Sequence, residues 1–128
     1  MAHFALLDSK NKVIFVTIVA NEKIIKDGVE VEQLGIDFLF NTVKIQSLYP
    51  EAVTAKQTSY NANFRNKYAG FGDTFDSEKD AFISVSPFPS WSLNGVNWEA
   101  PKAKPKGDYI WDEDKLDWIE FIKPINGN

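Results

Sequence analysis

Three pairs of aromatic residues recur at a fixed spacing of seven positions in the second half of the chain, and this spacing limits how that half can fold. The pairs are Phe75 and Phe82, Trp91 and Trp98, and Trp111 and Trp118. Between the members of the middle pair stands Asn94-Gly95, a dipeptide that favours a two-residue type I′ turn because both residues tolerate a positive φ. Around such a turn Trp91 lies opposite Trp98 on one face of a β-hairpin. The spacing therefore predicts aromatic-stapled hairpins.

The same count, applied to residues 109–121 (YIWDEDKLDWIEF), places Trp111 opposite Trp118 and acidic residues at the turn. Asp114-Lys115 suits a two-residue turn less well than Asn-Gly, so a four-residue loop over residues 113–116 is also compatible and keeps the tryptophans opposed. The other face of this hairpin is apolar as well, with Ile110, Ile119 and Phe121. A hairpin with two apolar faces needs two neighbours, one of which could be another protein chain.

The first part of the chain has a different pattern. "HFALLD" and "VIFVTIVAN" are apolar, β-branched runs on either side of a polar turn, which predicts an N-terminal hairpin. Because residues 13–20 are almost continuously apolar, we expect that strand to be covered on both faces. Residues 31–48 carry apolar side chains at spacings of three and four, which predicts one amphipathic helix that ends before Pro50.

The expected fold class is therefore α+β. An N-terminal β-hairpin and one amphipathic helix occupy residues 1–55, and a β-rich part made of aromatic-stapled hairpins occupies residues 56–128. The whole chain of 128 residues has the size of one ordinary domain. We therefore expect the two parts to fold as one cooperative unit.

Composition excludes several classes of protein. The net charge is -4 and no cluster of lysine or arginine is long enough to track a phosphate backbone, so nucleic acid is not an expected partner. There is no cysteine, which excludes disulfides and thiolate metal sites. The longest apolar run, residues 13–20, is too short to cross a bilayer, and the N-terminus has no secretion signal. We expect a soluble protein, made in a cytoplasm, with no membrane partner.

No group of residues has the composition of an active site. His3 is the single histidine, which excludes triads and multi-histidine metal sites. The acids of the last turn could be read as a general acid and base or as a calcium loop, but an exposed turn does not raise a pKa, and the glycine and final glutamate of a calcium loop are missing. These acids are Asp112, Glu113, Asp114 and Asp117. We expect them to form a solvated turn, and we expect no catalytic, cofactor-binding or metal-binding residue and no enzymatic activity.

Several segments of the chain resemble a family of known sequences. They are the start "MAHFALLD…VANE", the segment "LGIDFLF", the string "KQTSYNANFRNKYAGFGDTFDSEKDAFI", "PFPSW", and the end "YIWDEDKLDW". Together they resemble small proteins common in marine bacteriophages, chiefly those of cyanobacteria and pelagic bacteria, over almost the entire chain. The sequence departs from the family at Ala62, where a glycine is typical and a positive φ is thereby disfavoured, and in a shorter connection between Pro105 and Gly107.

The resemblance implies a component of the virion, without an assigned activity. Hairpins too thin to bury both faces, in a moderately acidic chain without a signal or cysteine, lead us to expect a non-enzymatic virion structural protein made in the host cytoplasm. It would decorate or cement the capsid, with a tail or neck location as the next choice. The expected partners are the major capsid protein or tail proteins and other copies of the chain, without a cofactor. Two alternatives stay open: a tail- or fibre-associated protein that stacks tryptophans on a host receptor or glycan, and a tail-fibre chaperone absent from finished virions. The expected interface residues are Phe75, Phe82, Pro87, Phe88, Pro89, Trp91, Trp98, Trp111 and Trp118.

Overall fold

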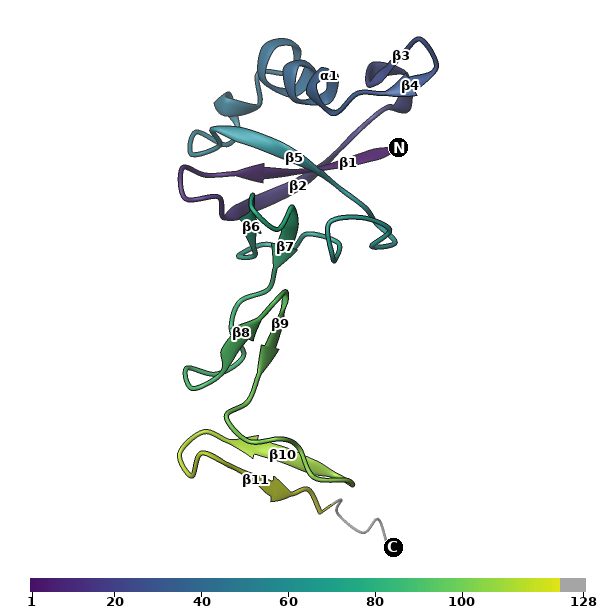
Figure 1. The fold of residues 1–128 in the computed structure, drawn as a ribbon. Helices are drawn as coiled ribbons and strands as arrows, with labels where there is room; N and C mark the ends of the chain where they lie inside the picture. The colour runs from purple at the N-terminus through teal and green to yellow at the C-terminus, as the bar shows by residue number, and fades with distance from the viewer. Residues whose placement is uncertain (123–128) are drawn as a thin grey trace, which may run out of the picture. The chain divides into compact units, whose positions relative to one another are not determined.

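The computed structural model describes residues 1–122 and divides the chain into two compact units, Met1–Val85 and Ser86–Asn128 (Figure 1). The described residues form one short α-helix and several antiparallel sheets, so the chain is α+β and mostly β, as its sequence predicts.

The centre of unit 1 is a three-stranded antiparallel sheet in the order β2-β1-β5. The strands are β1 (Ala2–Leu7), β2 (Val13–Val19) and β5 (Thr54–Thr58), and the predicted N-terminal hairpin is confirmed as β1–β2. The expectation that the second strand is covered on both faces is wrong. β2 lies at an edge of the sheet, where Phe15 and Ile18 are 42% and 53% exposed, and the strand buried along nearly its whole length is β1.

Successive side chains of β1 point to opposite faces of the sheet, so the core of unit 1 is divided between these two faces. One face is covered by α1 (Glu32–Asp37) and the turns that follow it, and the other by the hairpin of β6 (Thr74–Asp76) and β7 (Ala81–Ile83) (Figure 1). The first core contains Ala2, Phe4, Leu6, Val19, Ile24, Leu39, Ile45, Ala52 and Ala55. The second contains Ala5, Leu7, Val13, Ala69, Phe75 and Phe82.

The single amphipathic helix predicted over residues 31–48 is wrong in its extent. The helical region begins as α1, continues as a π-helical turn over Phe38–Thr42 and stops before Lys44, whose φ of 58° is left-handed; a short 3-10 turn, Ile45–Ser47, follows. Apolar residues keep a helix-like spacing across this break because those on both sides of it pack on the same core. Position 35 requires glycine for a steric reason, since a Cβ there would lie 2.2 Å from Cζ of Phe4.

Two short strands, β3 (Ile25–Lys26) and β4 (Val29–Glu30), form a small hairpin that leads into α1. A 3-10 turn over Asn21–Lys23 joins this hairpin to β2. The tight connection of β3 to β4 uses Asp27 and Gly28, both with positive φ, as a Gly-containing turn requires.

The predicted division between residues 55 and 56 differs from the division in the structure. It falls inside β5, which pairs with β1 from His3↔Thr58 to Leu7↔Thr54 and therefore belongs to the N-terminal sheet. The hairpin β6–β7 also belongs to unit 1, and its rings Phe75 and Phe82 are paired across the strands, as predicted, with centroids 5.1 Å apart.

Unit 2 contains two further hairpins. The first is β8 (Ser92–Asn94) with β9 (Asn97–Glu99), and the second is β10 (Tyr109–Asp112) with β11 (Asp117–Glu120). In the second, Trp111 lies opposite Trp118 as predicted, and the loop between the strands has the four-residue length. In the first, the predicted pairing of Trp91 with Trp98 is wrong, because Trp98 lies opposite Leu93.

The register of the first hairpin shifts because its turn is built on Gly95-Val96 instead of Asn94-Gly95. Gly95 has a φ of +64° and is the first central residue of the turn, the position at which a type II′ turn takes glycine. The same seven-residue spacing is therefore compatible with two registers.

The hairpins β6–β7 and β10–β11 share one loop design. In each, the aspartate that ends the first strand accepts a backbone hydrogen bond from a lysine three residues later: Asp76 from Lys79 at 3.0 Å and Asp112 from Lys115 at 3.1 Å. In each, the last loop residue is left-handed, with a φ of 50°. The internal repeat seen in the aromatic spacing is thus a repeat of structure for these two hairpins.

Candidate interaction site

The tryptophans of unit 2 form one cluster. The ring of Trp91, just before β8, lies 6.0 Å from the ring of Trp111 and 6.0 Å from that of Trp118, which are themselves 5.3 Å apart. Phe88 adds a fourth ring, 5.5 Å from Trp91. Steeply inclined contacts at these distances are the favoured geometry of aromatic pairs. Trp91 therefore packs against the last hairpin, which the seven-residue spacing did not predict.

The N–H groups of the three clustered indoles differ in their hydrogen bonding. Nε1 of Trp111 donates to Oε1 of Glu113 at 2.8 Å, and Nε1 of Trp118 donates to the carbonyl oxygen of Lys102 at 2.8 Å. Nε1 of Trp91 is buried and has no hydrogen-bond partner among the described residues. A buried donor without a partner is destabilising by about 1–3 kcal/mol.

Glu113 is more than a solvated turn residue, which corrects the expectation for this acid. Besides the Trp111 indole, its carboxylate accepts hydrogen bonds from Oγ of Ser90 at 2.7 Å and from the Ser90 backbone N–H at 3.1 Å. The Trp111 hydrogen bond, with those from Ser90, holds the pKa of Glu113 below its usual value. Glu113 thereby ties the "PFPS" segment to the last hairpin. Asp114 and Asp117 are exposed, as expected.

A cleft opens beside this cluster. It has a volume of about 430 Å³ and is lined by the rings of Trp91 and Trp118, the charged residues Glu99, Lys102 and Lys104, and two alanines. Aromatic ring faces together with polar groups can bind a flat or amphipathic ligand.

The expected interface residues fall into two groups. Phe75 and Phe82 are 3% and 0% exposed in the core of unit 1, and Trp111 is 7% exposed, so these three rings present almost no surface in this chain. The remaining six are half-buried or exposed, and all lie in unit 2: Pro87, Phe88, Pro89, Trp91, Trp98 and Trp118.

Unit 2 exposes apolar side chains at many other positions. They are Leu93, Ile110, Leu116, Phe121 and Ile122, each at least 36% exposed. Among residues 86–122, Trp111 is the one residue that is buried. The predicted two-sided apolar character of the last hairpin is seen at Ile110, which is 47% exposed on the face away from the tryptophans.

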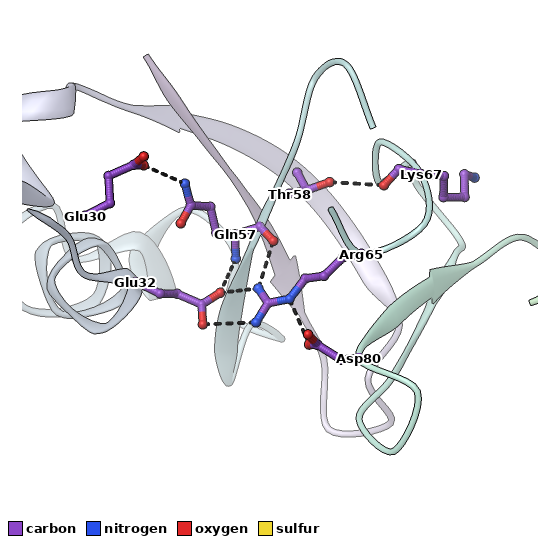
Figure 2. A network of polar contacts seen from close by, with 7 residues as sticks. All are labelled: Glu30, Glu32, Gln57, Thr58, Arg65, Lys67 and Asp80. Carbon is purple, nitrogen blue, oxygen red and sulfur yellow. Dashed lines mark hydrogen bonds and ion pairs between the residues drawn. The ribbon is translucent and has the colours of Figure 1, made fainter. Parts of the chain in front are cut away.

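Unit 1 contains a polar network centred on Arg65, the sole arginine of the chain (Figure 2). Its guanidinium makes a bidentate ion pair with Glu32, and its Nη1 also donates to the carbonyl oxygen of Gln57 at 2.9 Å. Its Nε donates to Asp80 at 2.9 Å. The backbone N–H of Gln57 donates to Glu32 at 2.6 Å. One side chain thus joins α1, β5 and the loop of the β6–β7 hairpin.

Charge and packing both fix this network. Burial by itself raises the pKa of Glu32, but the hydrogen bonds from Arg65 and Gln57 outweigh it, so the pKa lies below its ordinary 4.5. The guanidinium also lies over the ring of Phe75, 5.3 Å from its centroid, a cation–π distance. Because these partners are 33, 8 and 15 residues from Arg65 in sequence, local patterns did not reveal them, although the single arginine was a signal.

Arg65 belongs to a long irregular segment, residues 59–73. Hydrogen bonds between polar groups within the segment hold it in place. Asp73 accepts from Lys67 at 2.6 Å and from the N–H of Gly70 at 2.8 Å. Within residues 59–73, three non-glycine residues have a positive φ: Ala62, Arg65 and Asn66. Ala62 adopts a φ of 57°, so this position uses the conformation that glycine would adopt more easily.

His3 does not gather other candidate metal ligands. Its ring packs against Tyr60 and Tyr68 with centroids 5.6 and 5.5 Å away. Within residues 1–122, no group of three or more His, Cys, Asp or Glu side chains is placed to hold a metal ion. Over the same residues, no helix has the length and apolar character needed to cross a membrane.

Comparison with known proteins gives no relative: the chain matches no protein-family model, no curated protein and no solved structure. We therefore infer function from the arrangement of these residues.

Proposed function

We propose that this chain is a non-enzymatic structural protein of a bacteriophage virion, which decorates or cements the capsid and attaches through unit 2. The observation that carries the proposal is the near absence of a core in that unit. Trp111 is the one buried residue among residues 86–122, while apolar residues on both sides of the hairpins stay exposed.

Two-stranded hairpins are marginally stable alone, and exposed apolar surface in a small unit is typical of a protein contact. Unit 1 differs because it has its own sheet and two buried clusters. A folded body joined to hairpins that need a partner suits a protein that binds a larger assembly. The partners that we propose are the major capsid protein or tail proteins and further copies of the chain, in particles assembled in the host cytoplasm.

The contact surface that we propose consists of the half-buried and exposed members of the expected set. They are Pro87, Phe88, Pro89, Trp91, Trp98 and Trp118. Phe75 and Phe82 are left out because they are core residues of unit 1, and Trp111 acts by holding the cluster together.

Incorporation of variants into phage particles tests this proposal. Trp118→Ala should lower incorporation strongly, because it removes a ring from the cluster and from the cleft. Asp114→Asn, a change at an exposed position of the same hairpin, is the matched control and should leave incorporation unchanged. Equal incorporation of both variants, with both folded, would contradict the proposal.

The cleft beside Trp91 and Trp118 favours a second candidate, a tail- or fibre-associated protein that binds a host receptor or glycan. Aromatic faces flanked by Glu99 and Lys102 are suited to sugar rings, which offer apolar faces and hydroxyl groups. Titration of the intrinsic tryptophan fluorescence with host surface glycans separates the two candidates. A saturable change that Trp118→Ala abolishes would favour the glycan binder.

A further inference from the structure

The two edges of the three-stranded sheet in unit 1 differ. At the β5 edge the backbone of Gln57 is engaged on its outer side, because its N–H donates to Glu32 and its carbonyl oxygen accepts from Arg65 (Figure 2). Gln57 lies opposite Phe4 on β1. The backbone N–H and C=O of Gln57 point outward, so Gln57 and Phe4 exchange no backbone hydrogen bonds. The backbone N–H and C=O of Phe4 must therefore point to its other neighbour, β2.

This direction fixes which groups of β2 face outward. Phe4 is paired with Thr17, so the backbone of Thr17 points inward to β1. Backbone groups alternate in direction along a strand, and the N–H and C=O of Val16 and Ile18 therefore point away from the sheet. None of the hydrogen bonds described for residues 1–122 engages these outer groups.

The usual protection of an edge strand is missing here. Natural edges carry lysine, proline or a covering segment that prevents another strand from pairing. β2 reads VIFVTIV and has neither a charge nor a proline. Only its first residue is covered, because Val13 exchanges hydrogen bonds with Gly72 and Asp73 at 2.9 and 2.8 Å. The open edge consists of residues 14–20, with Thr17 at its centre.

We propose that a second copy of this chain pairs with β2, edge to edge and antiparallel, about a two-fold axis at Thr17. In this register Val16 lies opposite Ile18 of the second copy, and Phe15 lies opposite Val19 of the second copy. All four are β-branched or aromatic, the residue types that pair best across strands. Phe15 and Ile18, exposed on opposite faces of the single chain, both become covered.

Charges at the two ends of β2 fit the same arrangement. Lys12 and Glu22 flank the strand, and both are exposed. Neither forms an ion pair within 4.0 Å among the described residues, although the charge of Lys12 contributes to a lowered pKa of Asp8 in the same chain. The antiparallel two-fold brings Lys12 of each copy to the end that carries Glu22 of the other. Within one chain they lie beyond opposite ends of β2, whose seven residues span about 23 Å at about 3.3 Å per residue.

A groove at the N-terminal end of β2 offers the second copy further apolar surface. It has a volume of about 540 Å³ and is lined in part by Ile14, Tyr49 and Phe71, the last of which is 84% exposed. The end of β2 from the second copy arrives beside this groove. The pairing therefore buries apolar surface beyond the strand itself, as an isologous interface of this kind requires.

Sedimentation of the full-length protein over a range of concentrations tests the pairing, and its outcome is independent of any role in a virion. We expect a monomer–dimer equilibrium. Ile18→Lys places a charge at the edge and should raise the dimer Kd by about tenfold or more. Ile25→Lys, the same change at a similarly exposed position of β3, should leave the Kd unchanged.

A charge exchange tests the register. Lys12→Glu alone should weaken the dimer, and Lys12→Glu combined with Glu22→Lys should restore it, because the pair forms between copies. A monomer at every concentration would overturn the proposal, and so would a dimer that Ile18→Lys and Ile25→Lys affect equally. Failure of the double variant to regain the affinity lost by Lys12→Glu would overturn the two-fold register.

Discussion

Removal of the Arg65 side chain should destabilise unit 1 and leave unit 2 intact. In Arg65→Met the bidentate partner Glu32 keeps a single hydrogen bond, from the Gln57 N–H, and the carbonyl oxygen of Gln57 loses its donor. Breaking a fully buried ion pair costs about 3–5 kcal/mol. The side chains of Arg65 and Glu32 are 15% and 27% exposed, so the lower end, about 3 kcal/mol, applies here. The contact with Asp80, which is 67% exposed, adds only about 0.5 kcal/mol.

The distribution of tryptophan makes this prediction measurable for each unit. All four tryptophans lie in unit 2, between Trp91 and Trp118, so their fluorescence reports that unit, whereas far-ultraviolet circular dichroism also reports the sheet and helix of unit 1. In urea, Arg65→Met should shift the dichroism transition and leave the fluorescence transition in place. Lys10→Met, which removes an exposed cation from a turn, is the control and should change stability by less than about 0.5 kcal/mol.

Acid provides a second readout of the same network. The folded state lowers the pKa of Glu32, so this group contributes stability that is present above its ordinary pKa of 4.5 and is lost as pH falls through the lower folded value. Glu32→Gln should remove this part of the pH dependence below about 4.5. An unchanged dichroism transition in Arg65→Met, or full acid sensitivity of unit 1 in Glu32→Gln, would contradict this role of the Arg65 network.

Three further substitutions test other parts of the structure. Ala62→Gly should stabilise unit 1 by up to about 1 kcal/mol in urea unfolding, because position 62 has a φ of 57°; a loss of stability would contradict the left-handed assignment. Gly35→Ala should destabilise unit 1 by about 1–3 kcal/mol, since the added Cβ would meet the Phe4 ring at 2.2 Å; an unchanged dichroism transition would count against this close approach. Trp91→Phe should cost unit 2 less stability than Trp111→Phe, because the second loses a hydrogen bond to Glu113 and the first removes an unpaired N–H; equal costs by fluorescence-monitored unfolding would contradict the assigned hydrogen bonds.

Local signals in the sequence were enough for the hairpins but not for every register. The pairing of Trp111 with Trp118 was predictable because a four-residue loop and a two-residue turn, counted from the same acidic stretch, both place these rings opposite each other. The pairing of Trp98 was not, because Asn94-Gly95 and Gly95-Val96 are both acceptable turns, and moving the turn by one residue changes the partner of Trp98 by two, from Trp91 to Leu93.

The remaining features depend on contacts between distant parts of the chain. An apolar stripe over residues 31–48 predicts a helix, but it does not reveal that Lys44 adopts a left-handed conformation. Likewise β5 reads as the start of a new region until its pairing with β1 is known. The Arg65 network and the bond from Ser90 to Glu113 join residues far apart in sequence, and no spacing rule encodes such pairs.

Quantitative mass spectrometry of purified phage particles is the most direct test of a capsid-decorating role. If the chain decorates the capsid, we expect it in finished virions at a copy number comparable with that of the major capsid protein. A much smaller, tail-like number would move the protein from the capsid to the tail. Its complete absence from particles that contain the other structural proteins in their normal amounts would contradict the proposal that it is a component of the virion.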